Sequence, residues 1–116
     1  MPALIIRTNS SLTPEQKKEA SVALSRIISE CTGKPIDYIM VVIHDNVSIC
    51  FAGDPEAKAV FMEFMSIGCI SKAANKKTSS ALTKYMGELG FAGDRIYISF
   101  TNKDGADWGY NGSTFA

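Results

Sequence analysis

The sequence is built from two similar halves, and this internal repeat constrains the fold more than any other feature. Ala23-Leu24-Ser25-Arg26 aligns with Ala81-Leu82-Thr83-Lys84 at an offset of 58 residues (81 − 23). The same offset places Pro2 opposite Val60, near the start of a second strand-like segment. Since each half reads as strand, helix, strand, the sequence predicts two βαβ units.

Four segments have the composition of β-strands. They are Ala3–Ile6 and Tyr38–Ile43 in the first half, and Ala59–Ile67 and Arg95–Phe100 in the second. Tyr38–Ile43 is apolar on both parities, which is typical of a strand covered on both faces. We therefore expect this strand to be covered on each side.

Both helices carry clear boundary signals. Thr13 is a candidate N-cap before Pro14, and Gln16 completes a capping box. Gly33 is expected to end the first helix and Gly90 the second. An apolar stripe follows each helix: Ala20, Ala23, Leu24, Ile27, Ile28 and Cys31 in the first, and Thr78, Ala81, Leu82, Tyr85, Met86 and Leu89 in the second.

These elements predict an α/β fold in which two βαβ repeats form a four-stranded mixed sheet. Right-handed crossovers place both helices, antiparallel, on the same face of that sheet. The other face is then bare, and strands this apolar would expose a larger patch than a soluble monomer usually shows. We expect a closed homo-oligomer in which another copy of the sheet covers the bare face.

Length and composition narrow the function classes. A chain of 116 residues fits one domain, residues 1–116, with a single core. Twelve basic and twelve acidic side chains give no excess positive charge for nucleic acid. No apolar run approaches the roughly 20 residues that span a bilayer, and the opening segment lacks the basic flank of a signal peptide. We expect a cytoplasmic protein without a membrane or nucleic-acid partner, unless an unconventional route exports it.

The metal-ligating residue types form no recognisable set. Cys31, Cys50 and Cys69 match neither a disulfide framework nor a zinc signature, so we interpret them as reduced thiols. His44 is the single histidine, which excludes a multi-histidine metal cluster within one chain. It follows an apolar strand beside Asp45 and is more typical of a turn residue than of a catalyst. We therefore expect no metal and no cofactor.

Pro2 has two interpretations. Proline is tolerated as the first residue of a strand, where its missing N–H costs least. Alternatively, removal of Met1, which is usual before proline, would turn the Pro2 nitrogen into a free secondary amine. Position alone favours the structural interpretation.

Five fragments together indicate a family: MPALIIRTN (1–9), TGKPIDYI (32–39), SIG (66–68), DRIYISF (94–100) and WGYNGSTFA (108–116). In this order and at this chain length they resemble the macrophage migration inhibitory factor family of the tautomerase superfamily. The resemblance runs from end to end. It implies the two-βαβ fold, assembled as a homotrimer whose sheets form a barrel with active sites between subunits.

The resemblance implies a cofactor-free keto–enol tautomerase of phenylpyruvate-like aromatic α-keto acids, with dopachrome as a further substrate. Pro2 is then the base and afterwards the acid. A base that is neutral near pH 7 needs a site that lowers its pKa by apolar burial or a nearby positive charge. Lys34 is the candidate for that charge and for binding the substrate carboxylate. Its alternative role is to offset the dipole at the end of the first helix.

Further site residues come from the resemblance alone. Ile67 is expected to meet the substrate through its backbone amide and side chain. Tyr97 matches an aromatic wall that a neighbouring subunit contributes, and Phe115 matches a rim aromatic. Taken by themselves, Ile67 and Tyr97 would pass as core residues.

The chain departs from mammalian members at three places. Ser99 replaces an asparagine and reaches less far, which puts its substrate contact in doubt. Trp108-Gly109-Tyr110 replaces valine, glycine and tryptophan, so the preference among aromatic substrates is expected to shift. The C-x-x-C segment falls in Ala57–Met62, which has no cysteine, so we expect no thiol-oxidoreductase activity.

Two other functions remain as alternatives. The first is a secreted, cytokine-like ligand of a cell-surface receptor, as in vertebrate relatives, where export needs no signal peptide. The second is a structural trimer with a vestigial pocket. The joint presence of Pro2, Lys34, Ile67 and Tyr97 favours the enzyme over this second alternative.

Overall fold

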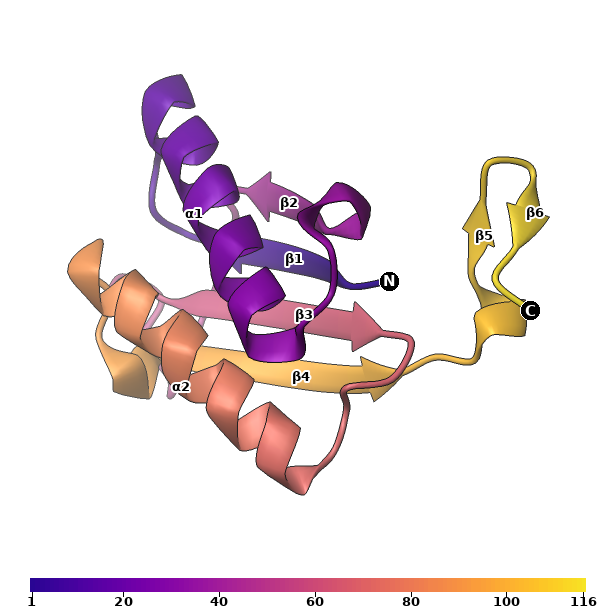
Figure 1. Ribbon diagram of the computed structural model, residues 1–116. Coiled ribbons are helices and arrows are strands. Elements are labelled where there is room, and N and C mark those ends of the chain that lie inside the picture. The colour runs from indigo at the N-terminus through magenta and orange to yellow at the C-terminus, as the bar shows by residue number, and fades with distance from the viewer.

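A computed structural model describes residues 1–116 and shows one sheet covered on one face by two helices (Figure 1). The first half forms β1 (Ala3–Thr8), α1 (Pro14–Thr32) and β2 (Met40–His44), and the second forms β3 (Val60–Ser66), α2 (Lys72–Glu88) and β4 (Ile96–Asn102). Short 3-10 helices are η1 (Ile36–Tyr38), η2 (Gly93–Arg95) and η3 (Gly105–Asp107). A C-terminal hairpin consists of β5 (Gly109–Tyr110) and β6 (Ser113–Thr114).

The sheet order confirms the predicted pair of βαβ units. The strands lie in the order β2-β1-β3-β4. Each half pairs its own two strands in parallel, and the central β1 and β3 are antiparallel. The two helices keep the offset of the repeat: α1 begins at Pro14 and α2 at Lys72, again 58 residues apart (72 − 14). Leu24 and Leu82, the matched positions of the repeat, are both completely buried.

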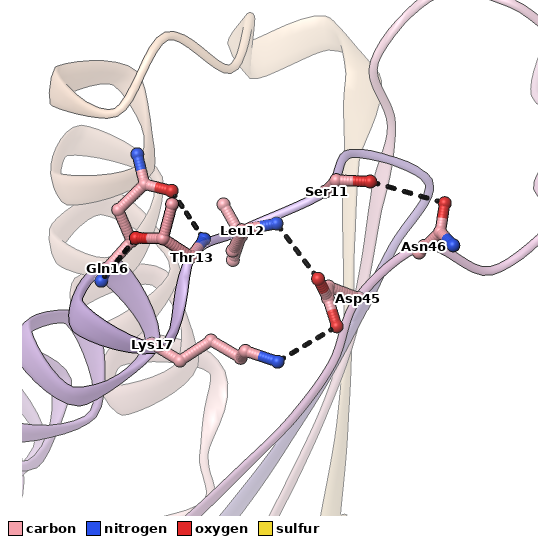
Figure 2. Close-up of polar contacts among 7 residues, drawn as sticks. All are labelled: Ser11, Leu12, Thr13, Gln16, Lys17, Asp45 and Asn46. Atoms are coloured by element: carbon pink, nitrogen blue, oxygen red, sulfur yellow. Dashed lines mark hydrogen bonds and ion pairs between the residues drawn. The ribbon is translucent and has the colours of Figure 1, made fainter.

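The helix boundaries follow the sequence signals. Gln16 N donates to Thr13 Oγ1 at 3.1 Å while Thr13 N donates to Gln16 Oε1 at 2.8 Å, so the capping box is confirmed (Figure 2). Gly33 adopts a φ of 72° after α1 and donates to Ser29 O at 2.8 Å. Helix α2 ends at Glu88, slightly before the predicted Gly90. Neither helix is long and apolar enough to cross a membrane.

The core lies between the sheet and the helices. Even-numbered residues of β1 and β3 point toward the helices, and odd-numbered residues point away. The helix-facing residues join side chains of α1 and α2 in a single cluster: Leu4, Ile6, Ala20, Leu24, Ile28, Val60, Met62, Phe64, Leu82, Met86 and Phe91. Burying each large member stabilises the fold by about 1.5–3 kcal/mol.

The face opposite the helices is open, and it is more polar than the sequence predicted. Arg7 and Glu63 form an ion pair on it at 3.3 Å. Met40, which is 62% exposed, lies on the same face at the edge of the sheet. Within one chain the strand predicted in Tyr38–Ile43 has helices on one face only, so the expected cover of its other face by another copy stays a prediction.

The boundaries of that strand also differ from the prediction. Tyr38 belongs to η1, because Pro35 directs the backbone into a short 3-10 turn before the strand begins. His44 is the last residue of β2 rather than a turn residue, and the turn starts with Asp45. His44 is exposed and remote from the pocket described below.

Candidate active site

Pro2 lies where β1 starts and is completely buried. Its carbonyl oxygen accepts a hydrogen bond from Met40 N at 3.1 Å, which continues the parallel pairing of β1 with β2. The residue therefore joins the ladder as an acceptor, and its missing N–H removes no bond from the interior of the strand. This agrees with the structural interpretation of Pro2 and leaves the chemical one open.

A pocket of about 220 Å³ opens beside Pro2. Eight of its 11 lining residues are hydrophobic. Three segments that are distant in the sequence form it: Met1–Ala3, Asp37–Met40, and the C-terminal tail, which supplies Trp108, Gly109, Tyr110 and Phe115. An apolar wall with few polar groups is typical of a site for a small, partly apolar molecule.

Three aromatic rings pack together at one side of this pocket. Tyr110 and Phe115 are stacked, with ring centroids 5.4 Å apart and an interplanar angle of 13°. Tyr38 meets both rings edge-on, at 5.6 Å from Tyr110 and 6.3 Å from Phe115. Such pairs are worth about 0.5–1.5 kcal/mol beyond their buried area.

The C-terminal hairpin positions two of these rings. Asn111 and Gly112 both have positive φ, 51° and 82°, as a tight two-residue hairpin turn requires. Phe115 N donates to the carbonyl oxygens of Gly105 and Trp108 at 3.1 and 3.2 Å, which returns the chain to the pocket. Gly105 permits this close approach, because a Cβ there would lie 2.5 Å from Phe115 O.

The environment of the N-terminal amine favours its neutral form. The pKa of the Met1 amino group is lowered from 8.0, first by burial and then by the positive charge of the nearby Lys34 ammonium. The Cys69 thiol acts weakly in the opposite direction. The Met1 amine therefore loses its proton more readily than an amine in water. The causes are burial and a nearby positive charge, the two means by which we expect a site to lower the pKa of an amine.

The structure brings together four of the predicted site residues and separates the others. Pro2, Trp108, Tyr110 and Phe115 all line the pocket. Lys34 does not line it, but its ammonium lies beside the N-terminal amine that does.

Three predicted residues do not reach the pocket of the same chain. Ile67 is half-buried in the turn after β3. Tyr97 and Ser99 lie on the open face of β4. Tyr97 is 64% exposed and packs against Phe51 with ring centroids 4.6 Å apart. Within one chain these residues form no common site with Pro2.

The sequence analysis assigned no site role to the pocket residues Ala3, Asp37, Tyr38, Ile39 and Met40. Asp37 and Tyr38 enter through η1, where we expected only a loop and the start of a strand. The Pro35 that precedes them was a signal for a turn, although it does not indicate which side chains face a ligand. The hairpin had a stronger signal, since Asn111-Gly112 is a favoured two-residue turn.

The cysteines lie outside this pocket. Cys31, Cys50 and Cys69 are all free. Cys69 Sγ lies 3.4 Å from Thr32 O, and the Cys69 backbone is left-handed, with a φ of 60°. No three histidine, cysteine, aspartate or glutamate side chains lie close enough together to hold a metal ion.

Two βαβ units with a proline-based pocket at the start of the first strand define the tautomerase superfamily. The sequence model of the family described as "Macrophage migration inhibitory factor (MIF)" matches residues 1–116, and the chain therefore belongs to this family. The resemblance noted from the five fragments is confirmed.

Individual relatives agree with this assignment along the whole chain. A macrophage migration inhibitory factor homologue from Trichuris trichiura is 39% identical over 92 residues, which cover 78% of this chain and 80% of the relative. One from Trichinella spiralis is 33% identical over 116 residues, or 99% and 100% of the two chains. The crystal structure of a homologue from Prochlorococcus marinus has a TM-score of 0.91 at 29% identity, covering 98% of this chain and 99% of that chain. Membership of the family supports a tautomerase or MIF-like function in general.

Proposed function

We propose that this protein is a cofactor-free keto–enol tautomerase of aromatic α-keto acids such as phenylpyruvate, and that it also isomerises dopachrome. The observation that supports this most is the apolar pocket beside Pro2, with the Lys34 ammonium close to the N-terminal amine. Tautomerisation needs a base that is neutral near pH 7 and an apolar surface for the aromatic ring. An N-terminal amine whose pKa is lowered and an apolar surface both lie at the start of β1.

The proposed mechanism uses the chain after removal of Met1. The Pro2 nitrogen is then a secondary amine, one residue further along the chain than the Met1 amine whose pKa is lowered, and Pro2 is itself completely buried beside the pocket. As the neutral amine it accepts the proton from one end of the O–C–C unit, and as the ammonium it delivers the same proton to the other end. Positioned proton transfer of this kind contributes roughly 10²- to 10⁴-fold.

The other residues bind and orient the substrate in this proposal. Lys34 holds the carboxylate, and the same charge keeps the pKa of the neighbouring amine low. Trp108, Tyr110 and Phe115 hold the aromatic ring. The hairpin therefore determines which rings fit.

We further propose that the active protein is a homotrimer in which Tyr97, with Ser99 two residues beyond it, reaches the pocket of a neighbouring subunit. Ile67 meets the substrate through its backbone amide and side chain. Two features support the homotrimer. The sheet face opposite the helices has no cover within one chain, and it exposes Met40 and Tyr97. Large exposed apolar side chains on one face mark interaction surfaces in soluble proteins.

The decisive experiment compares processed parent protein, shown by intact mass to lack Met1, with the Pro2→Gly variant. We expect the kcat for 4-hydroxyphenylpyruvate to fall roughly 10²- to 10⁴-fold. Pro55→Gly, at an exposed loop position, serves as the matched control and should retain the parental rate. Equal turnover by the parent and Pro2→Gly would refute the mechanism.

The alternative function is receptor binding as a secreted, cytokine-like protein. The names of the curated relatives support it, since they describe macrophage migration inhibitory factor and its homologues. This alternative includes secretion of the protein from the cytoplasm. The Pro2→Gly protein separates the two functions, because receptor binding that survives loss of turnover does not depend on the proline.

A further inference from the structure

Asp37 is the only acidic side chain that lines the pocket. It belongs to η1, which follows Lys34 and Pro35 in the chain and leads into β2. The backbone turn at Pro35 therefore places a negative group at a pocket that Lys34 approaches with a positive one. The two charges are only three positions apart in the sequence.

Asp37 and Lys34 do not neutralise one another. The ion pairs of the structure are Arg7–Glu63 and Lys17–Asp45, and neither involves the pocket. The Asp37 side chain is exposed and takes part in neither ion pair. A carboxylate accepts several hydrogen bonds, so this acceptor is free for a ligand.

We propose that Asp37 is a specificity-determining residue that accepts a hydrogen bond from a donor group on the aromatic ring of the substrate. This inference rests on the proposed tautomerase function and adds the substrate class to it. The pocket then has a cationic site for the carboxylate near Lys34, an aromatic wall for the ring, and an acceptor for a ring hydroxyl. Ring-hydroxylated α-keto acids are the favoured substrates, and rings with a second negative group are rejected.

The physical basis is the asymmetry of hydrogen-bond energies. A substrate with a ring hydroxyl exchanges a hydrogen bond to water for one to Asp37, which is a modest net gain. A substrate with a ring carboxylate meets the like charge of Asp37, which is exposed, so water screens the repulsion without removing it at short range. Specificity at this position therefore comes from repulsion as well as attraction.

The test measures kcat and KM for three substrates: phenylpyruvate, 4-hydroxyphenylpyruvate and 4-carboxyphenylpyruvate. The parent should prefer the hydroxylated over the unsubstituted substrate by roughly 3- to 10-fold in kcat/KM. Asp37→Ala should abolish this preference. Asp37→Asn should keep part of the preference, because the amide oxygen still accepts, while raising kcat/KM for the carboxylated substrate. The changes should fall on KM, since Asp37 does not contact the transferred proton.

Asp94→Asn provides the matched control. Asp94 is an exposed aspartate in a 3-10 helix, as Asp37 is, but it lies outside the pocket and should leave all three ratios unchanged. The contrary result is that all three proteins, the parent, Asp37→Ala and Asp37→Asn, turn over phenylpyruvate and show the same kcat/KM ratios among the three substrates. That result would overturn the role of Asp37 and leave the tautomerase proposal standing.

A binding measurement tests Asp37 in the case where the parent shows no turnover. If the folded parent turned over none of the three substrates, the proposed function would fail, and calorimetric binding of 4-hydroxycinnamate and cinnamate would still test Asp37. Tighter binding of the hydroxylated acid by the parent, lost in Asp37→Ala, supports the ring-donor contact. Equal binding of both acids, or binding of neither, contradicts it.

Discussion

The two ends of the sheet are built in different ways. At one end β1 and β2 finish and β3 and β4 begin; we call it the loop end, and it includes the connection between residues 45 and 59. At the other end lie Pro2, the pocket and the C-terminal hairpin, and we call it the pocket end (Figure 1). The loop end is held by side-chain hydrogen bonds to the backbone, whereas the pocket end is held largely by aromatic contacts.

Arg95 illustrates the loop end. Its guanidinium donates to four backbone carbonyl oxygens: those of Phe51, Asp54, Ala57 and Lys58, at 2.7, 3.3, 3.0 and 3.2 Å. It also lies over the Phe51 ring, 5.1 Å from the centroid. One side chain therefore fixes most of the long connection between β2 and β3.

The opposite side of the loop end has a second polar group. Asp45 accepts from Leu12 N at 2.9 Å and from Lys17 Nζ at 3.3 Å, which joins the end of β2 to the start of α1 (Figure 2). Ser11 Oγ reaches Asn46 Oδ1 at 3.3 Å in the same region. These contacts join the connection between β1 and α1 to the residues that follow β2.

At the pocket end polar groups are less well satisfied. The Ser66 hydroxyl is buried without a hydrogen-bond partner. The hairpin projects beyond the sheet and meets the rest of the chain through rings and the turn at Gly105 (Figure 1). Binding sites are drawn from the less stable parts of a fold, so this difference separates a stabilising end from a binding end.

The largest effect on stability should come from Arg95→Ala. The variant leaves four carbonyl groups without their donor, and we expect the free energy of unfolding to fall by about 2–3 kcal/mol. Urea unfolding at a fixed protomer concentration measures it. Arg95→Lys keeps the charge but not the planar guanidinium, so its free energy of unfolding should lie between those of the parent and Arg95→Ala.

Arg26→Ala is the control, because Arg26 is an exposed arginine of α1. Its unfolding should match that of the parent. A cost for Arg95→Ala no larger than that of Arg26→Ala would break the contrast between the two ends.

An intermediate effect, on binding rather than on stability, is expected for Tyr110→Ala at the pocket end. Tyr110 is 55% exposed, so its loss should change unfolding little. It removes the ring stacked on Phe115, and the KM for an aromatic α-keto acid should rise roughly 2- to 10-fold. Tyr110→Phe keeps the ring and should keep the parental KM. A loss of stability as large as that of Arg95→Ala would show that the hairpin is structural.

The smallest effect is expected from Asp45→Asn, and it depends on pH. The pKa of Asp45 is lowered from 3.8, first by the hydrogen bond from Leu12 N and then, against some burial, by Lys17. A carboxylate with a lowered folded pKa stabilises the protein above pH 3.8 and loses that contribution as pH falls through its folded value. The parent should therefore exceed the variant in stability at pH 7 and approach it as the pH falls from 3.8 through the lower folded pKa.

The measurement is the free energy of unfolding of the parent and of Asp45→Asn across this pH range. Asp104→Asn is the control, because the Asp104 side chain makes no capping hydrogen bond. A difference between parent and Asp45→Asn that grew on acidification would contradict the assignment of a lowered pKa.

Local signals predicted the parts of the fold that depend on local chemistry. Thr13 and Gln16 mark a helix start because their side chains bond the backbone within one turn, whatever the rest of the chain does. Gly33 ends the helix because its φ of 72° suits glycine. The repeat then predicted two βαβ units, and the structure pairs the two strands of each half in parallel.

The pocket was harder to predict because it depends on contacts between distant segments. Tyr38 was assigned to a strand from its apolar neighbours, yet it faces Tyr110 across more than seventy residues of chain. Apolar composition does not distinguish a ring in a core from a ring in a pocket. The proposed roles of Tyr97 and Ser99 need a second chain, which one sequence does not describe.

The position of the two chain ends has a practical consequence for anyone handling this protein. Met1 and Phe115 line the same pocket, and the N and C termini lie on the same side of the molecule (Figure 1). An affinity tag or fluorophore fused to either terminus would occupy or obstruct the site that it is meant to report on. An exposed side chain of α1 such as Lys18 is the better attachment point, because it lies outside the pocket and makes none of the contacts that hold either end of the sheet.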